Sequence, residues 1–298
     1  MKAVVLTYHS HHVLGPGYAQ NDHVALPVDL STITRSGGRI VSLATLVDAI
    51  EARQAGSAIV DSDATLVALT FDDGPVWDYA DFVHPVLGNQ RGFANVMQDF
   101  LLTPGGRAQT ELSATSFVIA SPEARRVMET AFDAEYTYLL RGALGDDWWP
   151  RAIATGLIGI GNHSWDHLHP ALESVAHSRQ VRGDFGQVTC TEDADAQIRA
   201  AMDYINARTG GRTAPFFAYP FGQFSDFLLE DYLPREGRAL GLRAAFTTEP
   251  RAIDGTQSVW RLPRFTCGKC VCVVGCIARL RLGERLCVVD IVSNIDRE

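Results

Sequence analysis

Apolar runs of strand length alternate with segments of helical character along this chain, and this order limits the folds open to it. The runs lie at residues 2–7, 64–70, 114–120, 157–161, 215–219 and 244–247. Helices are predicted at residues 43–51, 123–138, 193–208 and 236–241. A polar, Gly-containing loop is expected from the first strand to about residue 38. Repetition of strand, loop and helix favours a parallel sheet or an α/β barrel.

One domain is expected over residues 1–298, because the chain shows no internal repeat and no low-complexity linker. Residues 76–112 are long for a strand-to-helix connection. They are interpreted as an insertion of the kind that often forms a substrate loop or lid. The tail, residues 266–298, is atypical in its cysteine content. Its C-x-x-C from Cys267 to Cys270 is a zinc spacing, although free buried cysteines are the preferred interpretation.

The formal net charge of −9 argues against nucleic acid or an anionic membrane as partner, since both select basic patches. The apolar stretch at residues 3–6 is too short for a signal-peptide core. No apolar run approaches the ~20 residues of a membrane span. A cytoplasmic protein is therefore expected, with its oligomeric state left open.

Two adjacent carboxylates, Asp72 and Asp73, follow the second apolar run. Neighbouring carboxylates repel each other and lose hydration if buried, and a bound cation offsets both costs. Neighbours in a regular strand point to opposite faces, so both can face one site only where the strand breaks, as Gly74-Pro75 indicates. One carboxylate would then bind a metal while the other acts as a base. A solvated turn is the simpler interpretation of this dipeptide alone.

Two histidines, His163 and His167, stand four residues apart directly after another apolar run. This spacing places both rings on one face of a helix, as in a metal clamp. With one aspartate they would leave positions open for water and substrate, as catalytic zinc sites do. A third strand end carries Pro220-Phe221-Gly222, a turn that can release a backbone N–H to stabilise an oxyanion.

These segments resemble the polysaccharide deacetylase family, also called the NodB-homology domain or carbohydrate esterase family four. The family motif Thr-Phe-Asp-Asp-Gly is matched by Thr70–Gly74, and His-(Ser/Thr)-x-x-His by His163–His167. A third motif is matched in part by Tyr219–Gly222, and Tyr8-His9-Ser10 is similar to the start of many members. The resemblance covers residues 1–265. It implies a distorted (β/α) barrel of about seven repeats that hydrolyses a non-peptide carbon–nitrogen bond.

By this resemblance, Asp72 is the general base, and Asp73, His163 and His167 bind one divalent metal ion. The ion is expected to be zinc, with cobalt or nickel as alternatives. The metal and the backbone N–H of Tyr219 would hold the oxyanion. Further substrate contacts are expected from His11, Trp165, Pro220 and Phe221. Aromatic residues available for stacking on a sugar, or for the core, are Trp77, Tyr79, Trp148, Trp149 and Trp165.

Two departures from the family pattern concern residues around the base. The Arg that often orients the base is absent from the third motif, where Ala218 stands near its place. No histidine follows His177, so the late His that usually acts as general acid is also absent. His9 is the first choice for that acid. Asn21 and Asp22 are weaker candidates on the same loop.

The preferred function is removal of an N-acetyl group from a GlcNAc-containing saccharide. One alternative is hydrolysis of another non-peptide C–N bond, in an imide or a formamide. The other is a catalytically weak carbohydrate-binding relative, an alternative that the missing Arg and late His leave open.

Overall fold

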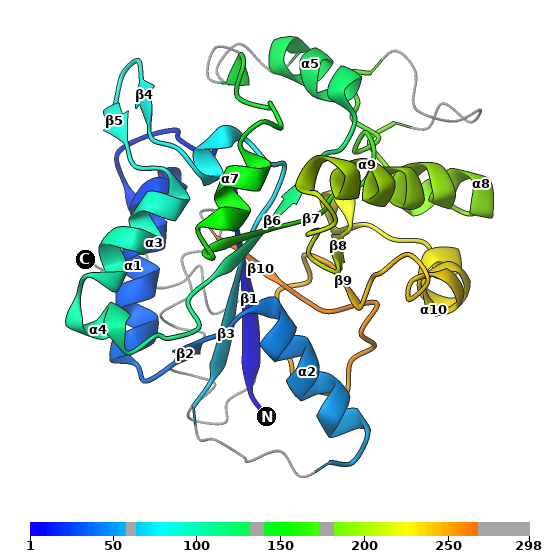
Figure 1. Ribbon diagram of the computed structural model, residues 1–298, viewed down its shortest axis with the longest axis horizontal. Helices are drawn as coiled ribbons and strands as arrows, with labels where there is room; N and C mark the ends of the chain where they lie inside the picture. Colours follow the sequence, from blue (N-terminus) through cyan, green and yellow to red (C-terminus); the bar gives the residue numbers. More distant parts are fainter. Residues whose placement is uncertain (58–63, 132–139, 173–181, 268–298) are drawn as a thin grey trace, which may run out of the picture.

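The computed structural model describes residues 1–57, 64–131, 140–172 and 182–267 (Figure 1). Its centre is one sheet in which every paired strand is parallel, in the order β10-β1-β3-β6-β7-β8-β9, with β2 beside β3. The strands are β1 (Ala3–Tyr8), β2 (Arg39–Ile40), β3 (Leu66–Phe71), β6 (Ala114–Val118), β7 (Ile158–Asn162), β8 (Phe216–Ala218), β9 (Ala244–Phe246) and β10 (Phe265–Thr266).

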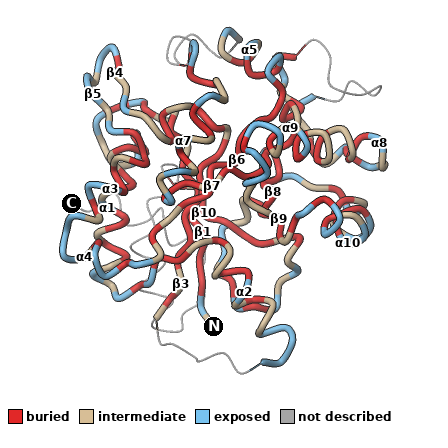
Figure 2. Tube along the Cα trace, in the orientation of Figure 1, coloured by how far each residue is buried: buried red, intermediate tan, exposed pale blue. Residues whose placement is uncertain are grey.

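The sheet curls into a distorted (β/α) barrel, as predicted. Leu262 forms a parallel bridge with Phe246 of β9, and the same segment continues into β10, which pairs with β1. Rings also meet across the inside: Phe117 of β6 lies 6.0 Å from Phe246, between ring centroids, although β7 and β8 separate their strands in the sheet. Figure 2 shows the strands buried along most of their length.

Helices surround the sheet (Figure 1). They are α1 (Asp22–Arg35), α2 (Leu43–Gln54), α3 (Phe93–Leu101), α4 (Pro104–Arg107), α5 (Pro122–Ala131), α7 (Trp149–Ala154), α8 (Thr191–Ala194), α9 (Ala200–Thr209) and α10 (Leu233–Glu236). The sequence predicted α2 and the start of α5, where Ser121 caps the N–H of Ala124. The rest of the helix expected to residue 138 lies outside the described residues.

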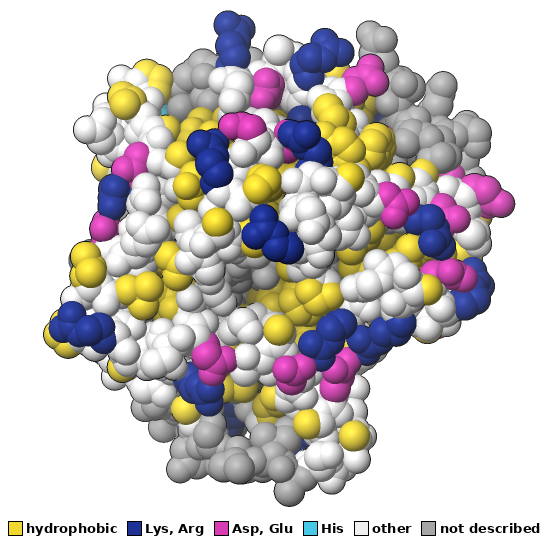
Figure 3. All heavy atoms as spheres, viewed as in Figure 1, with side chains coloured by type: hydrophobic (Ala, Val, Ile, Leu, Met, Phe, Trp, Pro, Cys, Tyr) yellow, Lys and Arg dark blue, Asp and Glu magenta, His cyan; other side chains and the backbone are white. Residues whose placement is uncertain are grey.

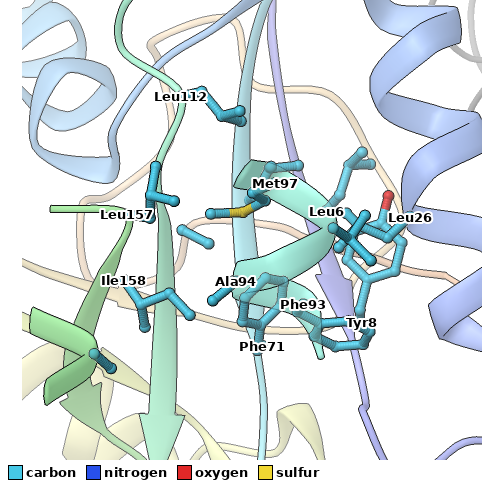
Figure 4. Packing of buried hydrophobic residues seen from close by; sticks show 14 of the residues in the cluster. Leu6, Tyr8, Leu26, Phe71, Phe93, Ala94, Met97, Leu112, Leu157 and Ile158 are labelled. Carbon is cyan, nitrogen blue, oxygen red and sulfur yellow. The ribbon is translucent and has the colours of Figure 1, made fainter. Parts of the chain in front are cut away.

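Side-chain alternation along β3 decides which residues reach the inside of the barrel. Val67, Leu69 and Phe71 pack outward in the cluster that also holds residues of α1 and α3. Figure 4 shows Phe71 there beside Phe93. Ala68 belongs to the inner cluster with Phe117 and Phe246. The same alternation, continued past the strand, turns Thr70 and then Asp72 inward.

The prediction of a loop from the first strand to about residue 38 is wrong, because residues 22–35 form α1. Pro27 within this helix disguised it, since proline in a helix interior removes a hydrogen bond. Its apolar face, Ala25, Leu26, Leu30 and Ile33, is fully buried. That burial outweighs the cost of the proline.

The predicted insertion supplies part of the core. Within it, β4 (Phe82–His84) and β5 (Gly88–Gln90) form an antiparallel hairpin. α3 follows and buries Phe93 and Met97 against the outer face of the sheet (Figure 4). This part of the insertion is therefore a packed layer and differs from the substrate lid suggested by its length.

The face in Figure 3 mixes basic and acidic side chains, in keeping with a chain of moderate negative charge. Among the helices of the described residues, none combines the length and apolar character needed to cross a membrane. Of the cysteine-rich tail, only Thr266 and Cys267 are described, and the Cys267 N–H donates to Thr7 O beside β1. The remaining tail cysteines lie outside the described residues.

Candidate active site

Asp72 and Asp73 stand where β3 ends, at the carboxyl-terminal edge of the sheet. Asp72 follows the inward alternation of the strand and is 3% exposed. Asp73 has a backbone φ of 72°, in the left-handed region that non-glycine residues rarely adopt. This turn lets two consecutive carboxylates reach the same pocket, which a regular strand forbids. The sequence located the break one residue later, at Gly74, which also has a positive φ.

Arg264 is the orienting partner of Asp72 that the third motif lacks. Its guanidinium donates to both oxygens of Asp72, with Nη1–Oδ1 at 2.7 Å and Nη2–Oδ2 at 2.8 Å. Nε donates to the carbonyl of Thr247, and Nη1 also reaches the hydroxyls of Thr7 and Thr70. The arginine comes from the segment before β10 instead of the third motif. The expectation that Asp72 lacks an orienting partner is therefore wrong.

This ion pair keeps Asp72 ionised inside the barrel. Burial raises the pKa of Asp72, but the charge of Arg264 and its hydrogen bonds, together with His163, hold that pKa below its usual range. Arg264 is fully buried and also lies over the ring of Phe117, 5.4 Å from its centroid. A bidentate arginine fixes the plane of a carboxylate as well as its charge. Asp72 is thus an oriented anion with a proton-free oxygen.

His163 and His167 meet in a loop, not on a helix face as their spacing predicted. The loop follows β7, and Ser164 and His167 have backbone φ values of 71° and 61°. Two side chains shape it, because Asn162 Oδ1 accepts from the Ser164 N–H and Ser164 Oγ accepts from the His167 N–H. The rings come to 4.8 Å between centroids. Local hydrogen bonds in this loop therefore bring the two histidine rings together, which was expected of a helix.

Asp73, His163 and His167 form a group suited to a metal ion. Their ligand atoms all lie within 4.8 Å of one another. Nε2 of each histidine is 3.6 Å from Asp73 Oδ1. That distance is too long for a hydrogen bond, but two ligands on one tetrahedral ion with bonds of about 2.1 Å stand roughly 3.4 Å apart. His163 Nδ1 lies 2.9 Å from the carbonyl of Ala218, which directs its Nε2 toward Asp73.

The protonation of this group also fits a cation. Burial and the neighbouring His163 lower the pKa of His167 to about 3, so its ring is neutral at physiological pH. Nδ1 of His167 is buried without a hydrogen-bond partner among the described residues. Burial raises the pKa of Asp73, but His167, His11 and other histidines hold it well below its usual range. An ionised carboxylate beside a neutral imidazole is the ligand state that divalent metals require.

Three more histidines line the same pocket from the loop after β1, which we call the histidine loop (residues 9–12). Ser10 anchors its middle from inside the protein. The Ser10 hydroxyl donates to Asp78, which also accepts from Ser116, both at 2.6 Å. The Ser10 carbonyl faces His23 Nε2 at 2.8 Å. With Ser10 fixed in the core, its neighbours His9 and His11 are held toward the pocket.

The pocket has a volume of about 470 Å³. It is lined by His9, His11, His12, Asp72, Asp73, Met128, His163, His167, His169, Tyr219, Phe221, Gly222, Thr248, Thr266 and Cys267. The structure thus brings the predicted base, the predicted metal ligands, His9 and His11 around one cavity. His11 Nδ1 lies 3.8 Å from Asp73 Oδ2, and burial lowers the pKa of His11 to about 4.

The predicted role of Tyr219 as oxyanion donor is wrong. Its backbone N–H donates to Phe246 O at 3.0 Å in the sheet. Its hydroxyl is also used, because it donates to the Trp260 carbonyl. The next N–H along the turn belongs to Phe221, which has a φ of 58° and a side chain that lines the pocket. Among the described residues, no acceptor is found for the Phe221 N–H.

Several predicted substrate contacts do not reach the cavity. Trp165 is half-buried and packs edge-on against Tyr204, 5.8 Å between ring centroids. Pro220 is buried and is not among the lining residues. The candidates for sugar stacking Trp77, Trp148 and Trp149 are core residues. Phe221, which is 42% exposed and packs 4.4 Å from His167 between ring centroids, is the aromatic residue that lies on the rim.

Arg264 and the pair of His12 with Asp22 are the features of the site that sequence reasoning missed or ranked low. A sequence signal for Arg264 did exist. It stands in Leu262-Pro263-Arg264-Phe265, and an arginine inside an apolar strand segment is rarely buried without an acidic partner. The identity of that partner is not visible in the sequence, because 192 positions separate the two residues.

Comparison with known proteins agrees with this geometry. A family model described as polysaccharide deacetylase matches residues 107–243, a range that contains His163 and His167 but not the Asp72-Asp73 pair. A search of curated proteins found no match. Solved structures with the same fold include IcaB from Ammonifex degensii, with a TM-score of 0.57 and 17% identity over 94% of this chain and 96% of that one.

Two other solved structures share the fold at similar distance. The Streptococcus pyogenes deacetylase PplD, in complex with acetate, aligns with a TM-score of 0.54 and 17% identity over 89% of this chain and 92% of that one. A de-N-acetylase from Aggregatibacter actinomycetemcomitans aligns with a TM-score of 0.52 and 15% identity, covering 89% and 94%. Residues 107–243 thus match the polysaccharide deacetylase family model, and the chain shares the fold of polysaccharide deacetylases, which supports a hydrolase of carbon–nitrogen bonds.

Proposed function

We propose that this protein removes an N-acetyl group from a GlcNAc-containing saccharide and depends on one divalent metal ion. The observation that carries the proposal is a base and a metal-ligand group side by side. Asp72 is held by Arg264, and the next residue, Asp73, lies with His163 and His167 in a group of converging ligand atoms. The side chains of Asp72, Asp73, His163 and His167 all line one cavity. Neither half alone would specify hydrolysis.

Asp73, His163 and His167 are the residues that would hold the ion, with zinc as the first choice. When bound there, a divalent ion would supply Lewis acidity that polarises the acetyl carbonyl and acidifies the attacking water. Zinc suits one carboxylate and two imidazoles, and three protein ligands leave space for substrate. Cobalt and nickel accept similar ligands, so this donor set alone does not select one of them.

Asp72 takes the proton of the attacking water. Its orientation by Arg264 and its lowered pKa leave it ready to accept a proton at neutral pH. The backbone N–H of Phe221 takes the place proposed earlier for Tyr219 and donates to the developing oxyanion. His9 supplies a proton to the departing amine. It lines the same cavity and follows β1, the strand that pairs with the end of β3 next to Asp72.

The choice of an N-acetylated sugar rests on the family and on similar structures. The family model is described as polysaccharide deacetylase. One similar structure is named a de-N-acetylase, and another was solved with acetate. A cavity of about 470 Å³ holds one sugar ring with its acetamido group more readily than a longer segment. The alternative of a catalytically weak binding protein depended on the absence of an arginine that orients the base. Arg264 pairs with Asp72 in that way, which counts against this alternative.

The proposal is tested by measuring the released product from a panel of substrates. The panel contains chitooligosaccharides, peracetylated xylan, a cyclic imide and a formamide, each with zinc or cobalt added. Acetate from the chitooligosaccharides, and free amine in equal amount, is the expected result. Ring opening of the imide or release of formate, with no acetate from any saccharide, would replace this function by the alternative C–N hydrolase.

A further inference from the structure

His12 and Asp22 form a pair at the edge of the cavity that the proposed chemistry does not use. His12 Nδ1 lies 2.8 Å from Asp22 Oδ1. The Asp22 carboxylate is fully buried, while the His12 side chain retains 12% exposure and lines the cavity. A carboxylate only accepts hydrogen bonds, so Nδ1 of His12 carries a proton. In the neutral ring, Nε2 is therefore a hydrogen-bond acceptor.

The pair is held firmly in place. The second oxygen of Asp22 accepts from the His9 N–H at 2.7 Å, and the Asp22 N–H donates to the His12 carbonyl. Asp22 is also the first residue of α1, whose N-terminus favours a negative charge. Three contacts thus fix the orientation of the His12 ring. A ring fixed in this way presents a single nitrogen to the cavity.

A histidine whose Nδ1 is hydrogen-bonded to a buried oxygen can use its Nε2 to bind a metal or a substrate. In His163 the oxygen is the Ala218 carbonyl, and Nε2 points at the metal-ligand group. His12 is not among the three residues of the described chain whose ligand atoms converge. His12 nevertheless lines the cavity, so it is available to a substrate bound there.

We propose that His12, oriented by Asp22, is a substrate-contacting residue that accepts a hydrogen bond from a hydroxyl of the acetylated sugar. The inference rests on the proposed function, because it needs a saccharide in the cavity. The histidine loop then has two roles. His9 donates a proton to the departing amine, and His12 accepts a hydrogen bond from a neighbouring hydroxyl of the sugar. Asp22 is a positioning residue, since it acts on the substrate only through His12 and the His9 backbone.

Two substitutions separate substrate contact from structural support. Asparagine at position 12 places an N–H near Nδ1, so His12→Asn keeps the bond to Asp22 and loses the acceptor. Glutamine reaches the position of Nε2, so His12→Gln keeps an acceptor for the sugar. We expect His12→Asn to raise KM for chitotriose about five- to tenfold with kcat nearly unchanged, the usual effect of one lost neutral hydrogen bond. His12→Gln should recover part of that loss, and His84→Gln, outside the cavity, should change neither constant.

Nitrogen-15 NMR of the histidine rings provides a readout that needs no turnover. We expect His12 in the Nδ1–H tautomer, with its Nε2 resonance shifting when chitotriose is added. In Asp22→Asn the amide can donate to Nδ1, which favours the opposite tautomer and should raise KM as His12→Asn does. Failure of wild-type protein to bind or deacetylate any saccharide would count against the proposed function itself.

Other outcomes count against His12 alone. Saccharide binding that leaves its resonance unmoved would overturn the proposal. So would wild-type KM in His12→Asn, or a loss of bound metal in that variant, which would make His12 a ligand.

Discussion

Replacing Asp72 with asparagine is expected to lower kcat by about a thousandfold, within the range for loss of a general base. The change is nearly isosteric and removes the proton acceptor. One amide oxygen can still accept from Arg264. Metal content should stay at the wild-type level, since Asp73, His163 and His167 are untouched. Steady-state acetate release and metal analysis of the purified variant measure both quantities.

A surface carboxylate gives the matched control for this substitution. Asp147, 77% exposed at the side chain and paired only with Arg151 in the described structure, should tolerate Asp147→Asn without effect on rate. A fully active Asp72→Asn would remove Asp72 from the base role. If the variant instead loses metal together with activity, Asp72 belongs to the ligands and the division of labour with Asp73 is reversed.

Replacing Arg264 with methionine should have the largest effect on stability. It leaves Asp72 buried without its counter-charge, a change that typically costs about 3–5 kcal/mol in the free energy of unfolding. The effect of burial is then opposed only by neighbouring histidines, so the pKa of Asp72 rises and the base is protonated over a wider pH range. The acidic limb of the pH–rate profile should therefore move to higher pH, with lower activity at neutral pH.

A double-mutant cycle distinguishes the ion pair from simple packing. Asp72→Asn combined with Arg264→Met removes both charges, so it should unfold at lower denaturant than wild type but at higher denaturant than Arg264→Met alone. Urea unfolding of the four proteins supplies the values. Additive losses would mean that the two residues do not couple, contrary to their bidentate contact.

The parts of this molecule that were predictable from sequence are those encoded locally. Buried strands are recognisable in the sequence as apolar runs. In a parallel sheet, the residues that follow these runs all lie at the carboxyl-terminal edge. That logic predicted where Asp72 and His163 would meet. It needed no knowledge of sheet order, because all paired strands point the same way.

What could not be predicted depends on distant or irregular contacts. The partner of Asp72 lies across the barrel closure, where short β10 joins β1 through a segment with weak strand character. α1 was hidden by Pro27, which only tertiary burial makes tolerable. The Tyr219 N–H donates to Phe246 O where the pairing of β8 with β9 ends, and the sequence does not show which strand is the partner. To predict each of these features, one would need to know which strand or side chain is the partner, and the amino-acid sequence alone does not show this.

Titration of the metal-free protein with zinc or cobalt tests the central claim most directly, with acetate release from chitotriose and bound metal measured on the same samples. The expected result is negligible release without metal, recovery as a single ion binds each chain, and neither binding nor recovery in His163→Ala. Full-rate acetate release from metal-free protein, or normal metal binding and activity in His163→Ala, would contradict the assignment of this cavity as a metal-dependent deacetylase site.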